Sequence, residues 1–214
     1  MTKVYPNVSP APLPKPSNGC SKPADDSSPM VLTVWRKSLL FNCDGFTVFD
    51  ADGNLVYRVD NYMSGNKGEI FLMDASGTSL LTIRRKKLSL TDSWLVFDGE
   101  TADNPRFVVT KNVVNLLRSK RLLAHVTSPR KNTAGYEVEG SYSRRCCAVY
   151  DEKRRRVAEI KQKEASVKGV AFGSDIFRLV VQPGFDATVA MAIVILLDQM
   201  FGSSTSTRRR LLTN

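Results

Sequence analysis

The sequence predicts a mainly β protein, in which a closed antiparallel barrel of about twelve strands encloses one C-terminal hydrophobic α-helix. Two observations predict this architecture. Short apolar segments separated by turn residues recur from Val31 onward, and one uninterrupted apolar stretch, Val189–Leu197, follows them. The chain of 214 residues suits one sizeable domain.

The predicted strands share a composition rich in Val, Ile, Phe and Thr, which suits a pleated and half-buried surface. They are Val31–Lys37, Phe46–Asp50, Leu55–Asp60, Ile70–Asp74, Leu80–Arg85, Trp94–Asp98, Phe107–Lys111, Leu122–Val126, Tyr136–Glu139, Cys146–Asp151, Val157–Lys163 and Ile176–Gln182.

A repeated turn signature favours an antiparallel meander. VFDADGNLVYRV (48–59) and LMDASGTSLLTI (72–83) share two apolar residues, Asp, two further residues and Gly, followed by a β-type run. Asp accepts hydrogen bonds from the turn backbone and Gly supplies a positive φ, so each motif predicts a tight hairpin. VYDEKRRRVAEI (149–160) has the same frame with Arg154 at the Gly position, and VFDGE (96–100) keeps the opening.

The apolar stretch near the C-terminus predicts a buried helix. Eleven residues separate Asp186 from Asp198, whereas a bilayer span needs about 20 apolar residues. No polar stripe interrupts the run, so the helix must be covered on all sides. Asp186 can cap its first turn, which predicts a helix over about residues 186–200. A barrel of about twelve strands can hold a helix, whereas about eight strands are filled by side chains.

The two ends of the chain differ in composition from the barrel region. Residues 1–29, rich in Pro and Ser, predict a disordered leader, and residues 202–214 predict a flexible basic tail, so the folded domain is expected to span 30–201. The start of the chain has no apolar signal core, which favours a cytoplasmic location. A peripheral position at the plasma membrane and a nuclear position, suggested by Arg208–Arg210, are alternatives.

Four segments carry a resemblance to a known family: CDGFTVFDADGNLVYRVDNY (43–62), RRKKLSLTDSWLVFDGE (84–100), YEVEGSYSRRCCAVYDEKRRRVAEIKQK (136–163) and FGSDIFRLVVQPGFDATVAMAIVILLDQM (172–200). Over roughly residues 30–201 the chain resembles the plant LURP-one-related family. The resemblance implies a tubby C-terminal-like fold, a twelve-stranded barrel around a central helix that is related to tubby proteins and phospholipid scramblases. It also implies a role in plant defence, to which one member is linked.

The charge of the chain indicates the sign of a partner. There are 31 Lys and Arg against 21 Asp and Glu, and residues 84–214 contain 24 of the cations and 13 of the anions. A positive field attracts anionic phospholipid, nucleic acid or acidic proteins. Aromatic residues make up 8% of the chain and do not alternate with the basic runs, so no specific nucleic-acid binding is expected.

Two basic clusters are the candidate sites for anionic lipid. They are Arg84, Arg85, Lys86 and Lys87 at the end of a predicted strand, and Lys153, Arg154, Arg155 and Arg156 in a predicted hairpin turn. In the first cluster, strand alternation would direct neighbouring cations to opposite faces. The tubby relationship implies that such cations bind phosphoinositide head groups, and each contributes about 1 kcal/mol near an anionic membrane. The alternative is that they only solvate an edge or a turn.

No catalytic or metal-binding set is predicted. The chain contains no GxSxG, P-loop or HExxH motif and has a single histidine. Its cysteines are not spaced as zinc ligands, and strand alternation predicts that Cys146 and Cys147 divide between the core and the outside. We therefore expect a non-enzymatic protein without a cofactor. Two functions remain open, an anionic-lipid-binding module and a protein-interaction scaffold for acidic partners in defence or stress signalling.

Overall fold

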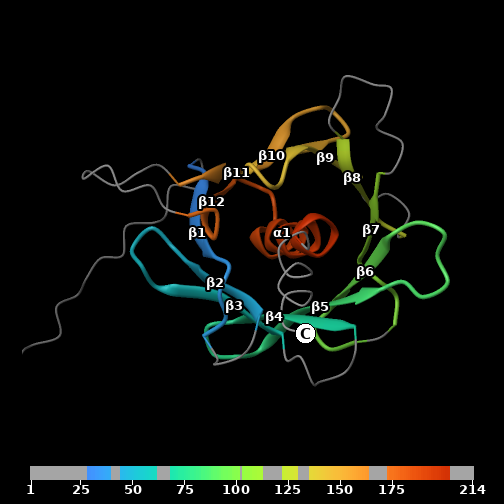
Figure 1. Ribbon diagram of the computed structural model, residues 1–214, viewed down its shortest axis with the longest axis horizontal. Helices are drawn as coiled ribbons and strands as arrows, with labels where there is room; N and C mark the ends of the chain where they lie inside the picture. Colours follow the sequence, from blue (N-terminus) through green and yellow to red (C-terminus); the bar gives the residue numbers. More distant parts are fainter. Residues whose placement is uncertain are drawn as a thin grey trace, which may run out of the picture.

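In the described part of the chain, twelve strands form a closed antiparallel barrel around one helix, as the sequence predicts (Figure 1). The computed structural model describes residues 28–39, 44–61, 68–101, 103–112, 122–129, 135–163 and 173–202. The predicted leader up to residue 27 and the predicted tail from residue 203, including Arg208–Arg210, lie outside the described residues.

Each strand pairs with the strands that precede and follow it in the sequence, and β1 also pairs with β12, which closes the ring. The strands are β1 Met30–Trp35, β2 Asp44–Phe49, β3 Leu55–Asn61, β4 Glu69–Asp74, β5 Ser79–Arg85, β6 Ser93–Asp98, β7 Phe107–Lys111, β8 Leu122–Thr127, β9 Tyr136–Ser141, β10 Cys146–Asp151, β11 Arg156–Gln162 and β12 Ile176–Val181. All predicted strands are confirmed, with ends that differ by at most two residues.

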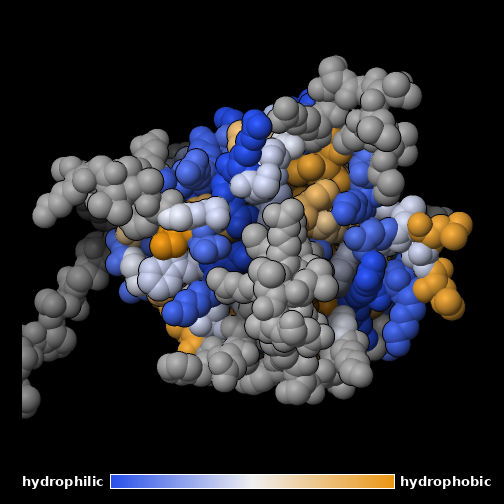
Figure 2. All heavy atoms as spheres, in the orientation of Figure 1, coloured by the Kyte–Doolittle hydropathy of each residue, from blue (hydrophilic) through white to orange (hydrophobic). Residues whose placement is uncertain are grey.

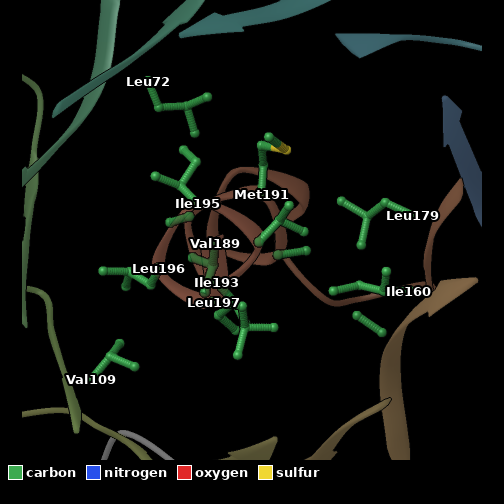
Figure 3. Packing of buried hydrophobic residues seen from close by; sticks show 14 of the residues in the cluster. Leu72, Val109, Ile160, Leu179, Val189, Met191, Ile193, Ile195, Leu196 and Leu197 are labelled. Carbon is green, nitrogen blue, oxygen red and sulfur yellow. The ribbon is translucent and has the colours of Figure 1, made fainter. Parts of the chain in front are cut away.

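Helix α1, Ala187–Phe201, lies inside the barrel and forms the centre of its core (Figures 1 and 3). Every residue from Val189 to Leu197 is at most 3% exposed. Strand side chains such as Leu72, Ile160 and Leu179 point toward the helix from different parts of the ring. The absence of a polar stripe in the sequence therefore has a structural reason, because apolar strand residues surround the helix on all sides.

The antiparallel order of the strands sorts the connections between two ends of the barrel. The end of the barrel where α1 begins is called the turn end, because the β2–β3, β4–β5 and β10–β11 turns lie there. The other, which we call the loop end, carries the β5–β6 loop and the C-terminus of α1. At the loop end, Asp198 of α1 accepts hydrogen bonds from Arg36 Nε at 2.9 Å and Tyr142 Oη at 3.1 Å.

Three turns at the turn end share one hydrogen-bond pattern. In the turns that begin at Asp50, Asp74 and Asp151, the Asp side chain accepts a bond from the backbone N–H four residues later, at 2.8 to 2.9 Å. The residue three positions after the Asp has a positive φ. This angle is 87° at Gly53 in the first turn, 91° in the second turn and 61° in the third turn. Arg154 is the counterpart in the third turn, so it occupies a backbone position that favours glycine, as the sequence frame predicts.

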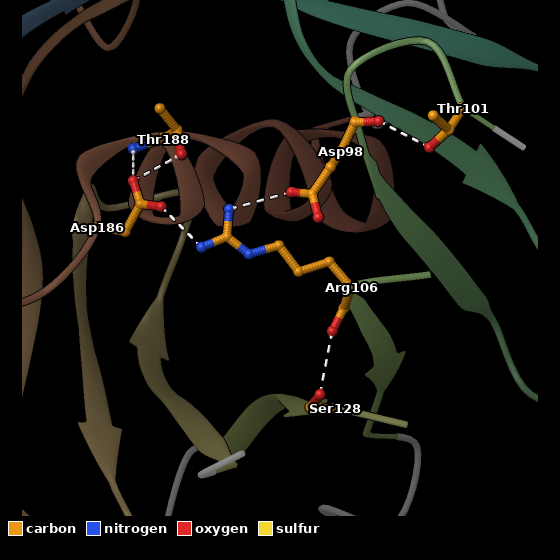
Figure 4. A network of polar contacts seen from close by, with 6 residues as sticks. All are labelled: Asp98, Thr101, Arg106, Ser128, Asp186 and Thr188. Carbon is orange, nitrogen blue, oxygen red and sulfur yellow. Dashed lines mark hydrogen bonds and ion pairs between the residues drawn. The ribbon is translucent and has the colours of Figure 1, made fainter. Parts of the chain in front are cut away.

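A polar network anchors the start of α1 to the barrel wall (Figure 4). Asp186 caps the helix, because its side chain accepts a hydrogen bond from the Thr188 backbone N–H at 2.8 Å. Arg106 bridges Asp186 at 2.8 Å and Asp98 at 3.3 Å. Burial of the Asp186 carboxyl tends to raise its pKa, but the hydrogen bonds from Thr188 and Arg106 outweigh burial and hold the pKa below its usual range.

Candidate functional site

The first basic cluster lies at the junction of β5 and the β5–β6 loop, which comprises residues 86–92. Strand β5 ends at Arg85, although the Lys86 backbone N–H still donates to the Ser93 carbonyl oxygen at 2.9 Å. Lys87 is already part of the turn. The predicted alternation between two faces therefore cannot apply to the whole cluster, because the chain leaves the strand after Arg85.

All four cations of the first cluster line one open hollow on the barrel wall, with a volume of about 1080 Å³. Leu95 and Phe97 of β6 add an apolar surface to its lining. The Arg84 guanidinium lies over the Phe97 ring, 5.2 Å from its centroid, which is a cation–π arrangement. The hollow thus combines positive charge with an apolar surface.

Two carboxylates partly neutralise this cluster. Arg84 Nε lies 3.0 Å from Glu69 Oε1, and an amino group of Arg85 lies 3.2 Å from Asp92 Oδ1. The two lysines that follow are exposed and form no ion pair with the described residues. Four cations beside two carboxylates leave two positive charges in this cluster.

The β5–β6 loop also presents two leucines that the sequence analysis did not single out. Leu88 and Leu90 have relative exposures of 107% and 108%, so both side chains are fully in solvent. In the view of Figures 1 and 2, this loop projects at the right edge, and hydrophobic side chains protrude there beside hydrophilic ones. The signal was available in RRKKLSLTD (84–92), where leucines directly follow the cations in a segment that precedes a strand.

The second basic cluster lies at the turn end, in and after the β10–β11 turn, and folding brings carboxylates to it. The ion pairs are Arg154 with Glu137 and Glu139, Arg155 with Asp151, and Arg156 with Glu159, at 2.8 to 3.1 Å. The fourth cation, Lys153, is exposed and forms no ion pair with the described residues. Arg154 also lies over the Tyr150 ring, 4.5 Å from its centroid. Three of the four cations therefore have partners within the fold.

The adjacent cysteines of β10 divide as the sequence predicts. Cys146 is exposed and Cys147 is buried. Burial and, to a smaller extent, the neighbouring Cys146 raise the pKa of the Cys147 thiol to about 12. A thiol with such a pKa remains protonated and unreactive near neutral pH.

Among the residues that the structure describes there is neither a cluster of metal ligands nor a membrane-spanning helix. Within these ranges, no three His, Cys, Asp or Glu side chains are grouped as metal ligands would be. Nor does any helix in the same ranges combine the length and the apolar character that a membrane crossing needs.

The fold defines the class of protein as an antiparallel β-barrel that encloses its own C-terminal helix. The sequence profile of the family described as LURP-one-related matches residues 30–198, and the chain belongs to this family. It is 52% identical to Protein LURP-one-related 8 of Arabidopsis thaliana over 95% of this chain and 100% of that protein. It is 49% identical to LURP-one-related 17 of the same plant, over 79% and 82% of the two chains.

A solved structure shows the same fold. An X-ray structure of an Arabidopsis thaliana protein is similar to this chain with a TM-score of 0.59 and 26% identity. The similarity covers 81% of this chain and 91% of that one. The resemblance that the sequence segments indicated is therefore confirmed for the family and for the barrel.

Proposed function

We propose that the protein is a non-enzymatic module that binds anionic phospholipid at a membrane surface, with the loop end of the barrel facing the membrane. The observation that supports this function is the pair Lys86 and Lys87, which are exposed, lack carboxylate partners among the described residues and border a hollow. Each such cation contributes about 1 kcal/mol near an anionic surface. The proposal implies a cytoplasmic protein that is peripheral at the plasma membrane.

The hollow also suits a phosphorylated head group, and a phosphoinositide is the ligand that we propose. The volume of the hollow, about 1080 Å³, is slightly above the range of roughly 300–1,000 Å³ found for small-molecule pockets. The Arg84 guanidinium can offer a phosphate two parallel N–H donors, although it must leave Glu69 to do so. The two lysines supply point charges at the rim.

The second cluster is a weaker candidate for lipid binding, because three of its four cations already have partners. Arg154 contacts two carboxylates, and Arg155 contacts the Asp151 carboxylate, which is 8% exposed. A phosphate at this site would have to displace carboxylates that also shape the β10–β11 turn. We therefore assign these cations to the stability of the turn.

The test measures sedimentation of the full chain with vesicles that contain phosphoinositide or, at equal charge, phosphatidylserine. The key variant is Lys86→Gln with Lys87→Gln, and its matched control is Lys153→Gln with Arg156→Gln, which removes the same charge from the turn end. In the control Glu159 keeps Lys161 at 3.0 Å. At about 1 kcal/mol for each cation, the key variant should bind roughly 30-fold more weakly, and the control should bind like the wild type.

Salt separates a formed site from a diffuse attraction. Between about 0.05 and about 0.3 M salt, the Debye length falls below 10 Å and weakens attraction between exposed charges. Selective binding to phosphoinositide that persists at the higher salt would support recognition of the head group. If the wild type sediments with neither kind of vesicle, or if the two double variants lose equal affinity, this function is wrong.

A protein-interaction scaffold in plant defence or stress signalling is the alternative. The same hollow favours it in one respect, because Leu95 lies beside the cations and can contact an apolar side chain of an acidic peptide. In that case the Lys86 and Lys87 variant would lose a protein partner while vesicle sedimentation of the wild type would be absent.

A further inference from the structure

We propose that the β5–β6 loop inserts Leu88 and Leu90 into the interfacial layer of an anionic bilayer, beside the cations that attract the membrane. This inference deepens the function proposed above and rests on it, because the leucines reach lipid only when the loop end faces the membrane. Beside head-group binding, the inserted leucines provide a nonpolar attachment, and salt does not screen this nonpolar attachment.

Folding removes neither leucine from water. Their relative exposures are 107% and 108%, whereas the other large exposed hydrophobic residues of the described chain are 37% to 53% exposed. Water-exposed apolar area favours any environment that removes it from water. The barrel itself provides no such environment for these two side chains, and a bilayer interface does.

The backbone of Leu88 strengthens this argument. Its φ is 58°, in the left-handed region where glycine and asparagine are favoured and a branched apolar residue is strained. Leucine is therefore an unfavourable choice at this position both for the backbone and for solvation. A strained residue that gains no contact within the fold is a reason to infer a function outside it.

The loop holds the leucines outward on a ladder of hydroxyl groups. The Ser89 and Thr91 hydroxyl oxygens are 3.2 Å apart, and the Thr91 hydroxyl lies 2.8 Å from that of Ser93. Ser93 continues the ladder to Thr110 of β7 at 3.2 Å. The hydroxyl residues alternate with the leucines along the chain, so the loop is already ordered in the conformation that presents them, which lowers the entropic cost of binding.

The surroundings of the leucines select an anionic bilayer as the partner. Lys86 and Lys87 directly precede Leu88, and both lysines are exposed without an ion pair to the described residues. Cations next to an exposed apolar tip match the bilayer interface, where negatively charged head groups border acyl chains. The loop therefore presents both groups that an anionic bilayer interface attracts, cations for the head groups and apolar side chains for the acyl region.

The first test replaces both leucines by asparagine. Asparagine tolerates a positive φ, so the variant Leu88→Asn with Leu90→Asn should keep or raise the Tm. Its partition onto phosphatidylserine vesicles should weaken roughly tenfold to a hundredfold, and binding at about 0.3 M salt should disappear while the wild type retains it. The control is Met30→Asn, which removes a 51% exposed apolar side chain from β1 at the turn end and should bind normally.

The second test observes insertion directly. Leu88→Trp should lose fluorescence on vesicles whose acyl chains are brominated, and the wild type gives the background from Trp35 and Trp94. Unchanged vesicle binding by the asparagine variant, without quenching of Leu88→Trp, would reject insertion and assign the leucines to a protein partner. If binding then still depends on Lys86 and Lys87, head-group binding stands alone. If the wild type binds no anionic vesicle, both proposals fall.

Discussion

The cluster Arg84–Lys87 and the cluster Lys153–Arg156 contain the same number of cations, yet folding places them in different surroundings at opposite ends of the barrel. At the loop end, two carboxylates partner two of the four cations, and two fully exposed leucines follow. At the turn end, four carboxylates partner three of the four cations, and the turn is fixed by the Asp151 side chain.

The difference shows that a run of cations in a sequence does not by itself define a binding surface. Glu137 and Glu139, which neutralise Arg154, come from β9 and are 17 and 15 residues away in the chain. They reach the turn because β9 and β10 pair in antiparallel register. Surface ion pairs contribute little energy individually, but here they decide which cluster keeps a net positive charge.

The first prediction concerns a substitution in β9, the strand that supplies two of the carboxylates of the second cluster. Gly140 of β9 has a φ of 124°, and a Cβ at this position would clash with the Cys146 carbonyl oxygen. Gly140→Ala should therefore lower the free energy of unfolding by about 3 kcal/mol or more, because strain and a backbone clash add. Chemical denaturation measures the loss.

Gly53→Ala is the matched control for this change. Gly53 also has a positive φ, 87°, but among the described residues no atom lies within 4 Å of an added Cβ. It should cost only the backbone strain, about 1 kcal/mol. If the two variants lose the same free energy of unfolding, the close packing of β9 against β10 at Gly140 contributes nothing beyond the backbone strain.

The fold was predictable from the sequence because its signals are local. The turn frame at Asp50, Asp74 and Asp151 depends on residues at most four positions apart, and Arg154, which takes the glycine position of this frame, has the positive φ of that position. The apolar run Val189–Leu197 predicted its burial because no face of that helix is polar.

The candidate site was only half predictable, because its character depends on contacts between strands. The four cations of the first cluster were visible in the sequence, but the carboxylate of Glu69 reaches Arg84 through the pairing of β4 with β5. The exposure of Leu88 was hidden for a different reason, since an apolar residue in a sequence is expected in the core until the backbone places it outside.

The second prediction uses acid to weaken the turn end. Hydrogen bonds from Asn54 and from Ser76 lower the pKa values of Asp50 and Asp74, respectively. Burial tends to raise the pKa of Asp151, but hydrogen bonds from the Arg155 backbone and side chain lower it overall. A carboxyl with a lowered folded-state pKa stabilises the protein above its unfolded pKa, about 4, and loses this contribution as the pH falls through the folded value.

The Tm should consequently fall by several degrees as the pH is lowered from about 5 to about 2, because these turns lose their ionised acceptors. Asp151→Asn should lower the Tm at neutral pH and make the acid-induced fall shallower. A wild-type Tm that stays constant over this pH range would contradict a stabilising role of the ionised turn carboxylates.

The third prediction adds one positive charge at either end. Glu69→Gln frees Arg84, which stays in the hollow because it lies over Phe97. One additional cation should strengthen binding to anionic vesicles about fivefold. Glu139→Gln adds the same charge at the turn end, where Arg154 keeps Glu137 at 3.0 Å, and should leave vesicle binding unchanged. An equal gain in both variants would mean that the total charge of the protein attracts the membrane. A gain in Glu69→Gln alone would locate the attraction at the hollow, where the exposed lysines and leucines lie together.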